Sequence, residues 1–101
     1  MSNPLEWQIN TFAHTAPVIG AVTTLALAAN QSRQYACLVN DGTEPIYIKI
    51  GAAAVLNEGI RLNAAGGSYE MSRALGNLTH LAVYGIHGGS GNKVLCGFEG
   101  D

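Results

Sequence analysis

The stretch RQYACLVNDGTEPIYIKIG, residues 33–51, decides the fold, because it contains two strand patterns separated by a turn pattern. In residues 46–50, isoleucine alternates with tyrosine and lysine, which is the period of a strand that buries one face. Residues 35–39 are apolar on both faces. Between them, residues 40–44 contain an Asp-Gly pair that tolerates positive φ, and Pro45 suits the first position of a strand because it lacks an N–H donor. We therefore predict a β-hairpin over this stretch.

Short strand patterns continue on both sides of this hairpin, separated by turns that contain glycine or asparagine. They cover about residues 20–26, 59–62, 68–72, 78–87 and 92–98. Residues 18–29, around the first of them, also suit a short helix, but β-branched residues and Gly20 favour a strand. Residues 88–91, GGSG, predict a flexible hairpin loop before the last strand. Six to seven short strands without a convincing long helix indicate an all-β fold, an antiparallel β-sandwich or a small barrel.

Residues 1–17 have the pattern of an extended N-terminal arm, which precedes a single domain of residues 18–101. Two prolines in this arm disfavour regular structure. Its apolar residues Leu5, Trp7 and Ile9 share one parity, so the arm could also join a sheet as an edge strand. Trp7 requires burial either in its own domain or against a neighbouring subunit, since tryptophan is enriched among interface anchors.

Charged residues make up only 12% of the 101-residue chain, whereas the usual share is about 25%. A surface this poor in charge fits a subunit that another copy of the chain covers, and the alternative is a monomer with a neutral surface. The net charge is −2 and the five basic residues are scattered, so we expect no binding to nucleic acid. No apolar run reaches the roughly 18–20 residues that span a membrane, so we expect no membrane partner. The N-terminus lacks a signal-peptide pattern, so we expect synthesis in a reducing cytosol.

The last two strand patterns, residues 81–86 and 94–98, are apolar on both faces. A sheet with one face in water should alternate between apolar and polar residues. These strands therefore either lie in a closed core or present their outer face to a partner. We favour a partner, because a chain of this size has little material with which to cover both faces of a sheet.

No combination of residues predicts catalysis, a cofactor or a metal site. Cys37 and Cys96 lie in apolar strand patterns, and we expect free buried thiols, with a bridge between neighbouring strands as the alternative. His80 and His87 are an odd number of positions apart, so a regular strand would place them on opposite faces. The segment GGSGN at 88–92 lacks the final glycine of a G-x-S-x-G nucleophile motif and the Gly-Lys of a phosphate-binding loop. We therefore expect a non-enzymatic protein.

Four segments together resemble small virion proteins of tailed bacteriophages: RQYACLVNDGTEPIYIKIG, GIRLNAAGGSYEM, AVYGI and KVLCGFEG. The resemblance covers about residues 21–100. It implies a β-sandwich that decorates, or cements, a capsid, often as a trimer where capsid hexamers and pentamers meet. The implied partners are further copies of this chain in a homotrimer and the major capsid protein or another virion protein. The implied location is the virion, after synthesis in the host cytoplasm.

Six apolar or aromatic residues in the arm and the last two strands are the contact residues that we expect. They are Trp7, Ile9 and Phe12 in the arm, and Tyr84, Ile86 and Phe98 in a subunit interface. Two alternatives use the same fold, namely a tail, fibre or baseplate module and a carbohydrate- or receptor-binding β-sandwich. The second alternative should group aromatic side chains in one groove, whereas the four tyrosines of this chain are dispersed among strand patterns.

Overall fold

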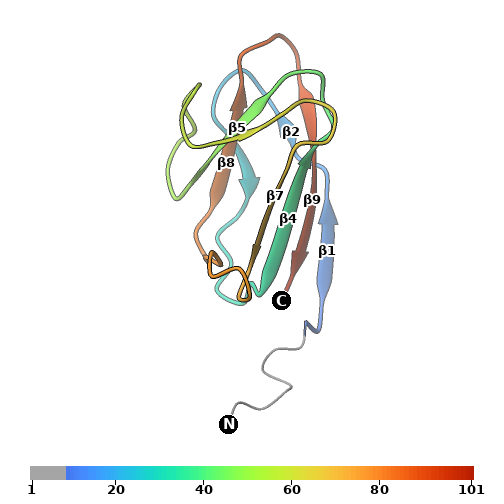
Figure 1. Cartoon of the computed structure of the whole chain (residues 1–101), viewed down its shortest axis with the longest axis vertical. Helices are drawn as coiled ribbons and strands as arrows, with labels where there is room; N and C mark the ends of the chain where they lie inside the picture. The colour runs from blue at the N-terminus through green and yellow to red at the C-terminus, as the bar shows by residue number, and fades with distance from the viewer. Residues whose placement is uncertain (1–8) are drawn as a thin grey trace.

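The structure is a computed structural model that describes residues 9–101 and places them in two antiparallel sheets packed as a β-sandwich (Figure 1). Within this range, the nine strands are β1 (Phe12–Thr15), β2 (Val18–Ile19), β3 (Thr24–Leu27), β4 (Tyr35–Asn40), β5 (Ile46–Ile50), β6 (Ile60–Leu62), β7 (Ser68–Ser72), β8 (Val83–His87) and β9 (Lys93–Gly100). The predicted all-β sandwich is confirmed. The same residues contain no helix that is long and apolar enough to cross a membrane.

The strand β9 organises the first sheet, whose order is β1-β9-β4-β7, and β2 also pairs with β9. The second sheet has the order β3-β8-β5-β6, and every pair in both sheets is antiparallel. The predicted number of strands was too low by the two short strands β1 and β2. Residues 12–15, which the sequence analysis assigned to the arm, are therefore an edge strand of the sandwich.

The predicted hairpin is wrong, although both of its strands are present. β4 belongs to the first sheet and β5 to the second, so the segment between them is an arch that crosses the sandwich. The side chain of Asn40 holds this arch, because its Nδ2 donates to the carbonyls of Glu44 (2.8 Å) and Leu62 (3.0 Å), and its Oδ1 accepts from the amide of Gly42 (2.9 Å). Residues 88–91 likewise join β8 of the second sheet to β9 of the first, so they are not a hairpin loop either.

The core follows the alternation in the sequence. In β4 every second residue from Ala36 onward is buried, and in β5 both Ile46 and Ile48 are buried. The buried apolar cluster between the sheets contains Ile19, Ala26, Leu27, Ala36, Leu38, Ile46, Ile48, Leu62, Met71, Val83 and Leu95. Among residues 9–101, no buried side-chain nitrogen or oxygen lacks a hydrogen-bond partner. The core is therefore apolar with a few fully satisfied polar groups, as expected for a stable domain.

Two strands differ from the sequence prediction for identifiable reasons. β8 begins at Val83 rather than at residue 78, because the carbonyls of Thr79 and Leu81 accept hydrogen bonds from the guanidinium of Arg33. The segment that also suited a helix forms the strand β3, so the helical alternative is wrong. An irregularity in the pairing of β3 after Leu25 lets two successive residues, Ala26 and Leu27, both point into the core.

His87 is fully buried and shapes the connection from β8 to β9. Its Nδ1 accepts from the amide of Gly89 (3.1 Å), so its proton resides on Nε2, which donates to the carbonyl of Gly91 (2.7 Å). We expect His87→Leu to lower the free energy of unfolding by about 2 kcal/mol, because it removes the two hydrogen bonds through which this buried side chain holds Gly89 and Gly91. Urea denaturation checks the loss, and nitrogen NMR of the imidazole should show the Nε2–H tautomer. The Nδ1–H tautomer would contradict this assignment.

The chain itself covers part of the outer surface of the second sheet. Residues 51–59, which connect β5 to β6, lie on the side of this sheet away from the first sheet (Figure 1). Ala54 is buried and its amide donates to Thr23 Oγ1 (2.8 Å), while Lys49 of β5 pairs with Glu58 (3.4 Å). The outward residues of β8, Tyr84 and Ile86, are consequently half-buried and 9% exposed, whereas Leu25 on β3 remains 47% exposed, so residues 51–59 cover only part of this side.

Candidate functional site

The outward side of the first sheet carries a continuous apolar and aromatic surface, which we call the outer face. Because Ala36 and Leu38 of β4 point into the core, the alternate residues of β4 and those opposite them on β9 and β1 point outward. The outer face consists of Phe12, His14, Val18, Tyr35, Cys37, Val39, Val94, Cys96 and Phe98. The side chains of Phe12 and Val18 are 53% and 47% exposed. A contiguous exposed apolar patch of this kind marks a surface for protein contact.

Phe98 lies at the centre of an aromatic cluster on this face. Its ring centroid is 5.0 Å from those of Phe12 and His14 and 5.6 Å from that of Tyr35. Gly100 opposite Phe12 has no side chain, and the ring of Phe12 and the side chain of Ile9 occupy the space that a Cβ there would need. The cluster is therefore held in place before any partner binds, which lowers the ordering cost of an interface.

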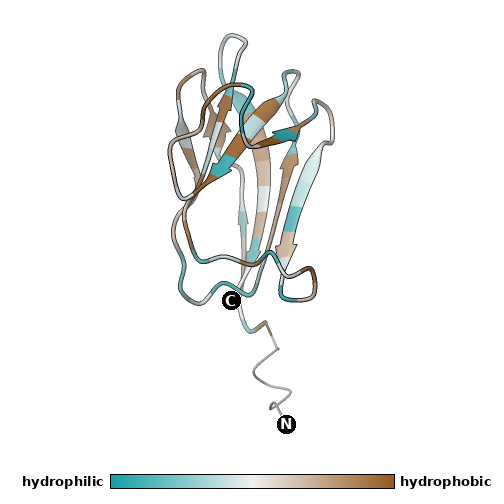
Figure 2. Cartoon of the chain, turned by 60° about the vertical axis from the view of Figure 1, so that its left-hand side comes forward, coloured by the Kyte–Doolittle hydropathy of each residue, from teal (hydrophilic) through white to brown (hydrophobic). Residues whose placement is uncertain are grey.

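The strand β7 gives the outer face a polar border. Its outward residues are Ser68, Glu70 and Ser72, and they are opposite outward residues of β4. Hydrophobic colours run along many of the strands in Figure 2. The sequence of β7, by contrast, has serine at both ends and the charged residue Glu70 in its centre. An apolar centre with a polar border is the usual anatomy of a protein interface.

Tyr35 and Glu70 are joined at this border, since the phenolic hydroxyl of Tyr35 donates to Glu70 Oε2. This hydrogen bond, with burial as a second cause, raises the pKa of Tyr35 to about 12. Burial, and then the charge of Glu70, also raise the pKa of the Cys37 thiol. Cys37 is thus further from the thiolate form at neutral pH than an ordinary cysteine, which disfavours a nucleophilic role.

The raised pKa of Tyr35 predicts an alkaline transition. A raised pKa means that the protonated phenol stabilises the fold below about pH 10, and that this contribution is lost as the pH rises from about 10 to about 12. Absorbance titration should show a tyrosine that ionises well above pH 10. Glu70→Ala removes the acceptor and should bring that late ionisation toward the ordinary range, with circular dichroism confirming that the protein remains folded. An unchanged titration in Glu70→Ala would contradict the role of this hydrogen bond.

The structure brings together only part of the predicted contact set. Phe12 and Phe98 stack on the outer face, and Ile9 lies beside them over Gly100. Trp7 lies outside the described residues. Tyr84 and Ile86 belong to the second sheet, where Tyr84 is half-buried and Ile86 is 9% exposed, so neither is part of the outer face.

Sequence reasoning did not include the outward residues of β4, Tyr35, Cys37 and Val39, in the contact set. The sequence nevertheless indicated that these residues could form an apolar outward surface, because residues 35–39 are apolar on both faces, as are the last two strands. The sequence analysis assigned that pattern to a hairpin with a buried first strand. The pairing of β4 with β9 shows that these residues continue the apolar surface of Phe98 and Cys96.

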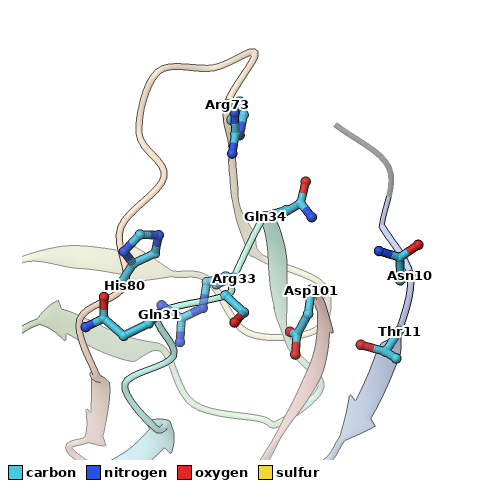
Figure 3. A pocket seen from close by; sticks show the side chains of 9 residues that line it. Asn10, Thr11, Gln31, Arg33, Gln34, Arg73, His80 and Asp101 are labelled. Carbon is cyan, nitrogen blue, oxygen red and sulfur yellow. The ribbon is translucent and has the colours of Figure 1, made fainter. Parts of the chain in front are cut away.

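A polar cavity of about 480 Å³ opens at the end of the sandwich near Asp101 (Figure 3). Its lining residues are Asn10, Thr11, Gln31, Ser32, Arg33, Gln34, Arg73, His80 and Asp101. The carboxylate of Asp101 accepts from Asn30 Nδ2 (2.9 Å), and its backbone pairs with Thr11. This lining offers hydrogen bonds but no tyrosine, tryptophan or phenylalanine platform, so it lacks the grouped aromatic residues expected of a carbohydrate site.

The described part of the chain contains no cluster of three His, Cys, Asp or Glu side chains that could hold a metal ion. His14 lies on the outer face, His80 lines the polar cavity and His87 is buried in the second sheet. Both cysteines are free thiols. Cys96 is exposed, whereas a buried thiol was expected from the sequence. The outer face is therefore the strongest candidate for a functional site.

No protein-family model, curated protein or solved structure matches this chain.

Proposed function

We propose that this protein is a structural, non-enzymatic virion protein that decorates the capsid of a tailed bacteriophage. The observation that supports the proposal is the outer face, a firmly held apolar surface on one sheet of a domain whose other sheet is partly covered by its own residues 51–59. The resemblance of residues 21–100 to small virion proteins favours the capsid as the place where such a surface is used. Low overall charge is consistent with a chain that is largely covered in an assembly.

The proposed mechanism is thermodynamic. A protein that binds the assembled shell but not its free subunits adds its binding free energy to the stability of the shell by mass action. Many copies bind one particle, so weak individual contacts sum through multivalency. In this proposal Trp7 of the arm contacts the shell or a neighbouring copy, and Ile9 and Phe12 connect the arm to the outer face.

The proposal is tested on virions of the phage whose genome carries this sequence. Purified particles are separated into heads and tails, and the chain is quantified in each fraction by mass spectrometry. We expect the chain in heads at many copies per particle. Its presence in tails alone would overturn capsid decoration in favour of the tail, fibre or baseplate alternative. Its absence from both fractions would overturn the virion role altogether.

We expect Trp7→Ala and Phe12→Ala, singly and together, to weaken binding to purified capsids. Truncation of an aromatic anchor at an interface costs more than about 1.4 kcal/mol, so each change should raise Kd at least about tenfold. Co-sedimentation with capsids measures the change. The matched control is Val22→Ala, which alters a 72% exposed side chain outside the strands. Equal binding of the double variant and the control would contradict the role of the arm.

A further inference from the structure

We propose that the outer face binds the outer face of a second copy of this chain, in a two-fold dimer whose axis runs along the strands between β9 and β4. This inference rests on the proposed role of the outer face as a surface for protein contact, and it names the partner of that surface.

One row of residues across the first sheet carries the argument. His14 on β1 is opposite Phe98 on β9, Phe98 is opposite Cys37 on β4, and Cys37 is opposite Glu70 on β7. The row therefore begins with an imidazole, passes through two apolar side chains and ends with a carboxylate. A two-fold axis that runs along the strands between β9 and β4 places this row opposite the same row of the second copy. The order of the residues in the second row is then reversed.

In that arrangement His14 of each copy lies over Glu70 of the other, and Phe98 lies over Cys37. Both ends of the row then pair an imidazole with a carboxylate, while the centre buries only apolar side chains. An axis that ran across the strands would instead place Glu70 over Glu70, so like charges would meet. Charge complementarity thus selects the first arrangement, which also keeps the strands of the two sheets aligned, as in common sheet-on-sheet packing.

The size of the face predicts a weak dimer. Four strands about 4.8 Å apart and the eight residues of β9 at about 3.4 Å each give roughly 500 Å² per copy. The total of about 1,000 Å² lies at the lower limit for a specific interface. We therefore expect an association of micromolar order or weaker, which appears only at the upper end of a dilution series.

The experiment is sedimentation velocity of the full chain over a dilution series. The wild type should shift from monomer to dimer as its concentration rises. His14→Glu should weaken the dimer by about tenfold or more, because it places like charges at both ends of the interface. The double variant His14→Glu with Glu70→Lys should restore the affinity, since it places a lysine over each introduced glutamate. Both positions are exposed, so the variants should remain folded, which circular dichroism verifies.

The matched control is Leu25→Glu, which introduces the same charge at an apolar side chain on the second sheet that is 47% exposed. It should leave the association unchanged. A monomer at every concentration, a trimer of the kind implied by the resemblance, or a double variant that fails to recover would each overturn the two-fold dimer. A chain found in phage heads but monomeric in solution would overturn this inference alone. A dimer that is absent from virions would overturn only the proposed function.

Discussion

Arg33→Met should lower the free energy of unfolding by about 3–5 kcal/mol, the range observed when one partner of a buried ion pair is removed. The side chain of Arg33 is fully buried, and its Nε donates to the carboxylate of Glu99. Its remaining nitrogens donate to the carbonyls of Ala28 (2.7 Å), Thr79 (2.8 Å) and Leu81 (3.0 Å). Methionine fills a similar volume but donates nothing, so a carboxylate and three carbonyls lose their partner together.

Urea denaturation followed by circular dichroism measures this loss as a lower midpoint at an unchanged slope. The control Glu99→Gln keeps an acceptor for Arg33 Nε and removes only the charge, so it should cost less, about 1–2 kcal/mol. In the double variant the unpaired carboxylate is gone, and the combined loss should be smaller than the sum of the two single losses. A loss below about 1 kcal/mol for Arg33→Met would show that water satisfies these carbonyls equally well.

Arg33 also explains a boundary that the sequence alone did not predict. Leu78 to His87 has a strand-like composition throughout, yet ladder pairing begins only at Val83. The carbonyls of Thr79 and Leu81 instead accept hydrogen bonds from the guanidinium of Arg33, which lies 46 and 48 positions away along the chain. Periodicity depends only on residues that are near one another in the sequence. It therefore cannot show that backbone carbonyls accept hydrogen bonds from a side chain that is distant in the sequence.

The strands themselves were predictable because their periodicity is local. β5 has the predicted alternation, and both β4 and β5 lie within one residue of the predicted bounds. Their pairing was not predictable from the same pattern, since alternation states which side is buried but not which strand lies beside it. The Asp-Gly pair at 41–42 favoured a tight turn, whereas the buried amide of Asn40 decides that the chain crosses to the other sheet.

The candidate site, like the fold, was predictable from the sequence only in part. Low charge and two-faced apolar strands predicted a surface that a partner covers, and the predicted contact residues Phe12 and Phe98 both lie on the outer face. The sequence did not reveal that residues 51–59 cover part of the outer surface of the second sheet, because this depends on contacts such as that of Ala54 with Thr23. Assigning Tyr84 and Phe98 to one contact set therefore combined residues from opposite sides of the sandwich.

Asn40→Asp should destabilise the protein by about 3 kcal/mol at neutral pH, although it changes only one amide to a carboxyl. Asn40 is fully buried, and its Nδ2 donates to the carbonyls of Glu44 and Leu62. An ionised aspartate would place negative charge against both carbonyl oxygens, and both donated hydrogen bonds would be lost. Only the bond from the amide of Gly42 to the side-chain oxygen survives the change.

The pH dependence of the stability distinguishes the effect of the buried charge and lost hydrogen bonds from an effect of altered packing alone. Burial beside two carbonyl oxygens raises the pKa of the introduced carboxyl above its unfolded value of about 3.9, so the variant regains stability as the pH falls toward that value. The difference between Asn40→Asp and the wild type should therefore shrink in acid, because the protonated carboxyl can donate to one carbonyl. The control is Asn63→Asp, an exposed position where the same change should cost less than about 0.5 kcal/mol. A loss for Asn40→Asp that stays constant between neutral and acidic pH would mean that packing, rather than the donated hydrogen bonds and the buried charge, controls the arch between the two sheets.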